Sequence, residues 1–147
     1  MSGVLYTTDI LRLATSIPHL GRLTDADAHV ERRSLVCGSR VCVDVRVDAA
    51  GRVAAFAQTV NACALGQAAA ALLGAHVIGR SQAELEAATA ALTAYLSGGR
   101  DDPGVWPGLL VFEAARPHSA RHASIRLPFE AATAAITEAL QARRHAA

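Results

Sequence analysis

The chain has 147 residues, the size of one ordinary domain, and we expect residues 1–147 to form a single domain. With 52% hydrophobic and 18% charged residues it is not a disordered chain, and a net charge of +1 offers no electrostatic basis for binding nucleic acid. All 14 basic residues are arginine, which excludes Schiff-base chemistry and a P-loop lysine.

The cysteines and the apolar segments predict a soluble cytoplasmic protein. The three cysteines, Cys37, Cys42 and Cys63, cannot all pair with one another, and the N-terminus lacks the pattern of a signal peptide. We therefore expect reduced thiols. The most membrane-like window, residues 62–79, is rich in alanine and glycine and contains polar residues, so we expect no membrane span.

The first half of the chain predicts a short helix followed by strands. A Thr-Thr-Asp start and an Ile-Pro end delimit a capped helix over about residues 7–17. Valines alternate with polar residues and cysteine over residues 41–47, which is typical of a half-buried strand. The tight connection at residues 49–51 leads to a second strand over 52–60, and a third strand is predicted at about 28–35.

The second half of the chain predicts helices. Asn61 is expected to cap the first, and the Ser81–Glu84 capping box opens the second. Pro128 marks either a kink or the first turn of the last helix. The predicted helices cover about residues 62–75, 81–96, 107–115 and 121–144. Because strands come first and helices follow, the fold class is α+β: a small three-stranded antiparallel sheet with helices packed on one face.

Cys37 and Cys63 are the first candidates for chemistry. A hairpin separates them, and an antiparallel hairpin returns the chain to the end where it began, so both thiols can reach one end of the sheet. Gly38 would let the backbone approach a ligand closely. Cys63 precedes a helix, whose dipole favours a thiolate nucleophile or metal ligand. Buried cysteines are also often small hydrophobic residues without chemistry, and the two residues alone leave both interpretations open. Cys42 alternates with the valines and is expected to be structural, away from the site.

A second dense segment, residues 116–124, contains two histidines at helical spacing. His122 lies near the predicted start of the last helix, where it could be a ligand or a proton carrier. The alternative is that His118 and His122 stack on an exposed turn, since no glutamate follows in the HExxH manner.

Four segments together carry a resemblance to a known family: residues 17–21 (IPHLG), 36–39 (VCGS), 60–66 (VNACALG) and 121–129 (RHASIRLPF). From about Leu5 to Leu140 the chain resembles the IscU/NifU N-terminal family of iron–sulfur cluster assembly scaffolds. The resemblance implies a three-stranded antiparallel sheet covered by helices. It also implies that a [2Fe–2S] cluster, iron or zinc binds through three cysteines aided by an aspartate and sometimes a histidine.

The resemblance assigns Cys37 and Cys63 as the first two cysteines, and His122 as the histidine before the third. Two positions depart from the family pattern: Ser39 stands in place of the aspartate, and Ala123 in place of the third cysteine. Cys37, Cys63 and His122 would be the metal and cluster ligands, with one position open. The set could also hold zinc with one water. The departures are compatible with a cluster shared between two chains, a carrier role, or loss of metal binding.

The leading functional hypothesis is a non-enzymatic iron–sulfur scaffold or carrier. Its partners would be a cysteine desulfurase, which supplies sulfur, and recipient apo-proteins. A second hypothesis is a zinc-binding sulfur acceptor that takes persulfide sulfur from the desulfurase. A third is an interaction module that keeps the fold without the metal.

Overall fold

A computed structural model describes residues 5–146 of the chain. Its sheet has three antiparallel strands in the order β1-β2-β3, which span Ala28–Arg33, Arg40–Val47 and Val53–Asn61. The helices are α1 (Thr8–Ala14), α2 (Ala64–His76), α3 (Gln82–Leu96) and α4 (His122–Ala146), with two short 3-10 helices, η1 (Leu109–Ala115) and η2 (Ser119–Arg121). The predicted α+β class with a three-stranded antiparallel sheet is confirmed.

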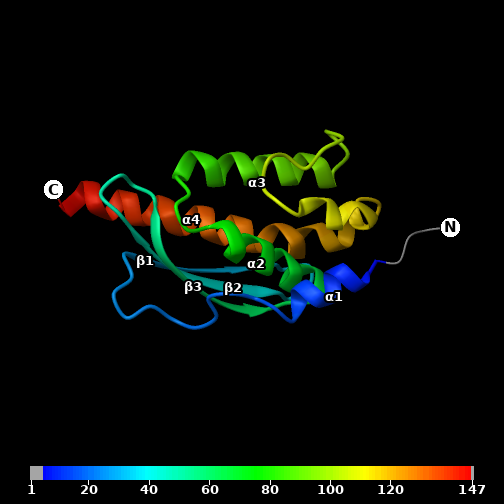
Figure 1. Cartoon of the computed structure of the whole chain (residues 1–147), viewed down its shortest axis with the longest axis horizontal. Coiled ribbons are helices and arrows are strands. Elements are labelled where there is room, and N and C mark those ends of the chain that lie inside the picture. The colour runs from blue at the N-terminus through cyan, green and yellow to red at the C-terminus, as the bar shows by residue number, and fades with distance from the viewer. Residues whose placement is uncertain (1–4, 147) are drawn as a thin grey trace.

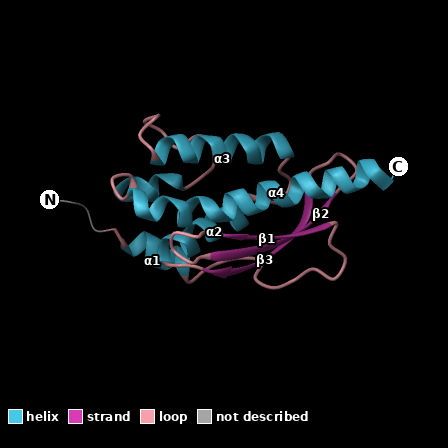
Figure 2. Ribbon diagram, turned by 180° about the vertical axis from the view of Figure 1, so that it is seen from behind, coloured by secondary structure: helices cyan, strands magenta, loops and turns pink. Residues whose placement is uncertain are grey.

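The helices form layers on one face of the sheet, as Figures 1 and 2 show from opposite sides. α4 packs against β1 and β2, and α2 packs against α4. α3 lies outside α4, away from the sheet, and α1 lies against α2. The strands are therefore covered by α2 and α4, α3 forms an outer layer over α4, and α1 lies beside α2.

The alternation of β2 explains how the sheet is oriented. Its four valines, at positions 41, 43, 45 and 47, are buried and belong to the core. Cys42 and Arg46 are half-buried on the opposite face of the strand. Because side chains alternate across a strand, burying the valine set under α4 fixes the register of the whole sheet.

Several helix boundaries were predicted correctly. Thr7 caps α1 by accepting a hydrogen bond from the N–H of Ile10 at 3.2 Å. The capping box is present at α3, where Ser81 and Glu84 bond to each other's backbone N–H. The last helix begins at His122, one residue after the predicted start.

Two other expectations were wrong in detail. Asn61 is not a helix cap, because it pairs with Arg40 as the last residue of β3. The N-cap of α2 is Cys63, so the helix begins at Ala64 rather than at residue 62. The short helix predicted over 107–115 is present as a 3-10 helix that begins at Leu109.

The proline of the last helix lies in its interior rather than in its first turn. Pro128 is buried within α4 and belongs to the helical stretch on both sides. A proline in the interior removes one backbone hydrogen bond of the helix, and the first-turn alternative was wrong.

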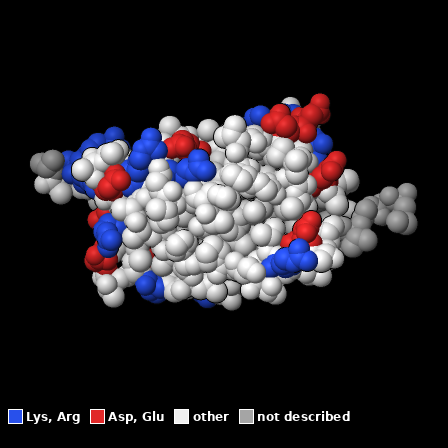
Figure 3. All heavy atoms as spheres, in the orientation of Figure 1, with Lys and Arg blue, Asp and Glu red and all other residues white. Residues whose placement is uncertain are grey.

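Charged side chains lie around the margin of the face seen in Figure 1. Figure 3 shows that arginines and acidic residues gather near the ends and edges of this face, and its centre is uncharged. Within residues 5–146, no helix combines the length and apolar character needed to cross a bilayer.

Candidate functional site

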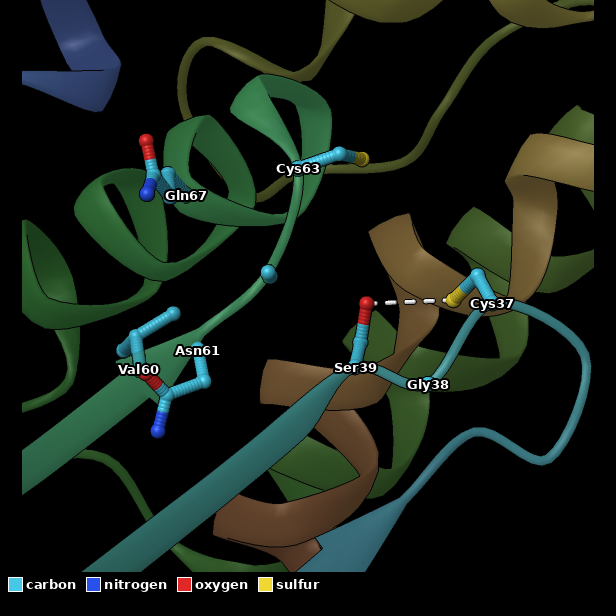
Figure 4. Close-up of a pocket in the computed structure, with 8 residues that line it drawn as sticks. Cys37, Gly38, Ser39, Val60, Asn61, Cys63 and Gln67 are labelled. Carbon is cyan, nitrogen blue, oxygen red and sulfur yellow. Dashed lines mark hydrogen bonds between the residues drawn. The ribbon is translucent and has the colours of Figure 1, made fainter.

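The register of the sheet brings Cys37 and Cys63 to the same end of the molecule. Arg40, the first residue of β2, pairs with Asn61, the last residue of β3. The loop that precedes β2 therefore lies beside the segment that follows β3. Cys37 is in that loop and Cys63 is in that segment. One cysteine before the hairpin and one after it therefore lie at the same end of the sheet (Figure 4).

The two cysteines line one open pocket of about 370 Å³. Cys37 is exposed and Cys63 is half-buried, and both are free thiols. The pocket is lined by Cys37, Gly38, Ser39, Val60, Asn61, Ala62, Cys63 and Gln67. Among the side chains that line the pocket, only the two cysteine thiols can become charged. The thiols are therefore the strongest metal ligands that the pocket offers.

Two buried serines connect the thiols. The Ser39 hydroxyl lies 3.0 Å from the Cys37 sulfur and 3.2 Å from the hydroxyl of Ser124. The Ser124 hydroxyl lies 3.3 Å from the Cys63 sulfur. Ser39 and Ser124 are 3% and 1% exposed, so both hydroxyls are held in place by the fold. The result is a continuous hydrogen-bonded path from one thiol to the other.

Gly66 allows α2 to approach α4 closely enough for this path to form. A Cβ atom at Gly66 would lie 2.6 Å from the Ser124 hydroxyl oxygen and 2.7 Å from the Ala62 Cβ. Only a glycine fits there without displacing its neighbours. Gly66 thus positions Ser124 beside Cys63.

Gly38 has a conformational role in the loop before β2. A Cβ at Gly38 would meet no protein atom within 4 Å, and the predicted close approach of its backbone to a ligand stays a prediction. Its φ of +71° places it in the left-handed region, which glycine adopts without strain. Gly38 therefore shapes the turn that aims Cys37 at Ser39.

The hydrogen bonds around Cys37 favour its thiolate. Partial burial raises the pKa of the Cys37 thiol, but hydrogen bonds from Ser34, from the Ser39 hydroxyl and backbone, and from Ser124 outweigh this effect. The pKa of Cys37 is therefore held below its ordinary value. A thiolate is the form that binds metals and attacks sulfur, so these hydrogen bonds favour the reactive form of Cys37.

His122 is buried rather than stacked on an exposed turn with His118. Its Nε2 donates a hydrogen bond of 2.9 Å to the carbonyl oxygen of Ala115. Across residues 5–146, no three side chains of the His, Cys, Asp and Glu types gather closely enough to hold a metal ion. The structure thus brings Cys37 and Cys63 to one pocket but does not bring His122 into the same group.

Two further positions complete the comparison with the sequence. Cys42 lies on the opposite face of the sheet, with its sulfur 3.5 Å from a carboxylate oxygen of Glu31, away from the pocket. Ser124 was given no role by sequence reasoning, although it belongs to the quoted 121–129 segment. The only local signal for Ser124 was that it is a small polar residue in the first turn of a helix face that is otherwise apolar. It follows the half-buried Ala123.

The chain matches a known family. The profile described as the NifU-like N terminal domain matches residues 5–101. Among curated proteins, none is significantly similar to the chain.

Solved structures extend the likeness over most of the chain. A nitrogen-fixing NifU-like protein (N-terminal) from Brucella abortus is 35% identical, with a TM-score of 0.87, over 93% of this chain and 95% of that one. A putative iron–sulfur cluster assembly scaffold protein for the SUF system from Fervidobacterium islandicum AW-1 is 18% identical, with a TM-score of 0.78, over 90% and 96% of the two chains. At 18% identity the second likeness concerns the fold alone.

Proposed function

The chain belongs to the family of NifU-like N-terminal domains, and on that premise we propose that it is a scaffold or carrier for iron–sulfur clusters. The cluster is its cargo, assembled from iron and sulfide and passed to recipient apo-proteins. This is a role in binding and transfer rather than in turnover of a small substrate. We also propose that residues 1–147 act as one domain and work in the cytoplasm.

One observation carries the proposal: two free thiols from opposite sides of a hairpin meet at a single open pocket. Cysteine thiolates are the ligands that hold iron–sulfur clusters. Cys37 and Cys63 are therefore the proposed cluster ligands. An open pocket also suits a cargo that has to enter and leave.

Ser39 and Ser124 form hydrogen bonds with the thiols, but they do not supply the negative charge of the family's aspartate. A carboxylate adds a negative charge that helps to hold a cation, whereas the Ser39 hydroxyl is neutral. Hydrogen bonds to ligand sulfurs instead tune the potential and stability of a cluster. We assign Ser39 and Ser124 to this role, because each hydroxyl lies within hydrogen-bond distance of a thiol.

His122 is the proposed third donor. Because a carbonyl oxygen only accepts, the hydrogen bond to Ala115 places a proton on Nε2 and leaves Nδ1 as the nitrogen able to bind a metal. Metal-binding histidines commonly hold their other ring N–H on such a carbonyl. His122 would join the site only when iron or zinc draws the pocket together.

The test is anaerobic reconstitution with ferrous iron, L-cysteine and a cysteine desulfurase, followed by iron and sulfide analysis and a visible absorption spectrum. We expect Cys37→Ala and Cys63→Ala each to lose most of the bound iron. Cys42→Ala is the matched control and should retain it, since that thiol lies on the other face of the sheet. His122→Ala should lower the iron content by less than either cysteine variant.

The proposal fails if wild type binds no iron, or if the Cys37, Cys63 and Cys42 variants all bind the same amount. Either result would leave the third hypothesis, an interaction module that keeps only the fold.

A second candidate function, a sulfur acceptor that also binds zinc, is favoured by one specific observation. Cys37 is exposed and its pKa is lowered, as a sulfur-accepting nucleophile requires. The Cys37 thiolate would attack the outer sulfur of a persulfide on the desulfurase. The S–S bond of that persulfide breaks, a new persulfide forms on Cys37, and the desulfurase cysteine leaves as a thiolate.

Mass spectrometry tests this second candidate. After incubation with desulfurase and L-cysteine, the wild-type chain should gain the mass of one sulfur atom. Cys37→Ala should gain none, and Cys63→Ala should still gain it. Zinc content of the purified chain, measured in the same samples, shows whether a zinc ion accompanies the reaction.

A further inference from the structure

We propose that Cys63 releases sulfide from a persulfide carried by Cys37 of the same chain. The Cys63 thiolate attacks the inner sulfur of that persulfide, so the two cysteines end as a disulfide and the outer sulfur leaves as sulfide. This inference rests on the sulfur-acceptor function proposed above. It adds the step that converts the accepted sulfur into the form that a cluster contains.

The electron count is the first argument. The outer sulfur of a persulfide is at the oxidation level of elemental sulfur, whereas a cluster contains sulfide, so two electrons have to be supplied. Two thiols that join as a disulfide release two electrons. The pocket contains two thiols, Cys37 and Cys63, and the third cysteine of the chain, Cys42, lies on the opposite face of the sheet. The pocket therefore contains the reductant for one sulfur atom.

The unequal exposure of the two thiols is the second argument. Cys37 is exposed, so it can meet a persulfide on another protein. Cys63 is half-buried in the same pocket, and its side chain makes no capping hydrogen bond to α2. The Cys63 sulfur is thus less accessible to a second protein but free to attack within the pocket. An exposed reactive cysteine is often accompanied by such a resolving cysteine.

The serine path is the third argument, because it supplies the proton transfer that the step needs. The Ser124 hydroxyl lies 3.3 Å from the Cys63 sulfur and 3.2 Å from the Ser39 hydroxyl. The Ser39 hydroxyl lies 3.0 Å from the Cys37 sulfur (Figure 4). Because a hydroxyl both donates and accepts hydrogen bonds, a proton can pass from Cys63 to the sulfur carried by Cys37.

The step balances in atoms and electrons. It begins with an ionised persulfide on Cys37 and a neutral thiol on Cys63. The proton of Cys63 passes to the outer sulfur, the Cys63 sulfur bonds to the Cys37 sulfur, and the bond between the two persulfide sulfurs breaks. The outer sulfur leaves with that electron pair as HS⁻, reduced by two electrons, while each cysteine sulfur is oxidised by one. A dithiol reductant then restores the two thiols.

The loop that carries Cys37 has room for the movement that the disulfide requires. The Cys37 sulfur has to leave Ser39 and cross the pocket to Cys63, because a disulfide bond is only about 2.05 Å long. The two residues before Cys37, Leu35 and Val36, are 98% and 74% exposed. Movement of the middle of the loop therefore displaces no buried apolar side chain.

An aromatic disulfide reagent tests the attacking thiol without a desulfurase. Chains with Cys42→Ala, which keeps only the two pocket thiols, receive one equivalent of dithiobis(nitrobenzoate). We expect two coloured thiol anions per chain and a protein that has lost two hydrogen atoms by mass spectrometry. With Cys63→Ala added, we expect one anion and a lasting adduct on Cys37. A lasting adduct in the chain that keeps Cys63 would overturn the proposal.

The second experiment measures sulfide directly. A cysteine desulfurase is loaded with sulfur from L-cysteine, freed of L-cysteine by desalting, and mixed with the same two chains without other thiols. The chain with both pocket thiols should gain one sulfur atom transiently, release HS⁻ and end as the Cys37–Cys63 disulfide by peptide mapping. With Cys63→Ala the sulfur should stay on Cys37, and at least about tenfold less sulfide should appear.

Two variants of one serine test the proton path. In the same assay Ser39→Ala should slow the release of sulfide from the loaded chain by about fivefold, the effect of one neutral hydrogen bond. Ser39→Thr should restore the rate, because threonine keeps the hydroxyl. Equal rates in the two variants would overturn the proton path and keep the attack by Cys63.

The outcomes separate this inference from the function on which it rests. Sulfur that stays on Cys37 although Cys63 is present would overturn the role of Cys63 and keep the sulfur acceptor. No sulfur on Cys37 of either chain would overturn the sulfur acceptor and the sulfide release that rests on it. Neither result bears on Cys37 and Cys63 as cluster ligands, which iron analysis tests.

Discussion

Two regions of the same sheet handle polar side chains in opposite ways: the outer face around Asp44, and the pocket around Cys37 and Cys63. Asp44 is 1% exposed, and its Oδ2 accepts hydrogen bonds from the Arg22 side chain at 2.7 Å and the Leu23 N–H at 2.9 Å. Its Oδ1 is bonded to Nδ1 of His29. Both oxygens of this carboxylate are thus used within the chain.

The electrostatics of Asp44 follow from these partners. Burial raises the pKa of Asp44, but hydrogen bonds from Arg22, His29 and the Leu23 backbone outweigh it and hold the pKa below its ordinary value. The carboxylate ties the segment that enters β1 to the sheet. Its role is therefore structural.

The pocket leaves its polar groups with unused capacity. Cys37 and Cys63 contact neutral serine hydroxyls, and no charged partner lines the pocket with them. The sulfurs keep lone pairs that a metal ion can use. The comparison teaches that a polar group satisfied by its own fold holds the fold together, while one satisfied only in part is available to a ligand.

Replacing the carboxylate on the outer face gives the largest expected effect on stability. Asp44→Asn leaves the donors of Arg22 and Leu23 facing a neutral amide, and we expect it to lower the free energy of unfolding by about 2 kcal/mol. Asp25→Asn is the control, because Asp25 is exposed and paired with Arg46, and it should lower the free energy by less than about 1 kcal/mol. Urea denaturation measures both. Equal effects of the two variants would contradict the structural role of Asp44.

The same carboxylate predicts how stability depends on pH. A carboxyl group whose pKa is lowered by folding stabilises the fold above its unfolded pKa, near 3.8 for aspartate, and this stabilisation is lost as the pH falls below that value. We expect the wild-type chain to lose more stability than Asp44→Asn between pH 5 and pH 2. Urea midpoints across this range test it, and parallel curves for the two chains would contradict it.

Adding a side-chain atom between α2 and α4 gives the next largest expected loss of stability. Gly66→Ala gains helix propensity, yet its Cβ would lie 2.7 Å from the Ala62 Cβ and 2.6 Å from the Ser124 hydroxyl. We expect a net destabilisation of about 1–2 kcal/mol by urea denaturation, together with weaker iron binding, because Ser124 would have to move away from Cys63.

The control for this change is another glycine without such contacts. At Gly99 the nearest atom to an added Cβ is the Ala94 carbonyl oxygen at 3.4 Å. Gly99→Ala should change the free energy of unfolding by less than about 0.5 kcal/mol and leave iron binding unchanged. A stable Gly66→Ala chain that binds iron normally would show that the close approach is not needed.

The parts that sequence reasoning predicted correctly depend on local patterns. The alternating valines of β2 and the capping box of α3 each follow from a few neighbouring residues, and both are present. The start of α2 was wrong because Asn61 is a good helix cap locally, whereas its pairing with Arg40 is a contact distant in sequence. Local preference lost to the strand pairing.

The same distinction between local patterns and distant contacts applies to the residues of the site. Cys37 and Cys63 could be found because the hairpin between them is visible in the sequence. Ser124 could not, since its position depends on α4 meeting α2 at Gly66. The His29–Asp44 contact was missed for the same reason, because it joins β1 to β2 across the sheet.

The smallest expected effect concerns the reactivity of the Cys37 thiol in the pocket. It is compared with the reactivity of the Cys42 thiol on the opposite face of the sheet. The hydrogen bond from Ser39 helps to lower the pKa of Cys37, so Ser39→Ala should raise that pKa and reduce the thiolate fraction near pH 7. One neutral hydrogen bond is modest, so alkylation of Cys37 by iodoacetamide should slow by about threefold. Cys42, measured by peptide mapping in the same sample, is the internal control and should react at an unchanged rate, because Glu31 rather than Ser39 is its neighbour. If Cys37 reacts equally fast in both chains, the serine path does not activate it, and Ser39 only fills space beside the thiol.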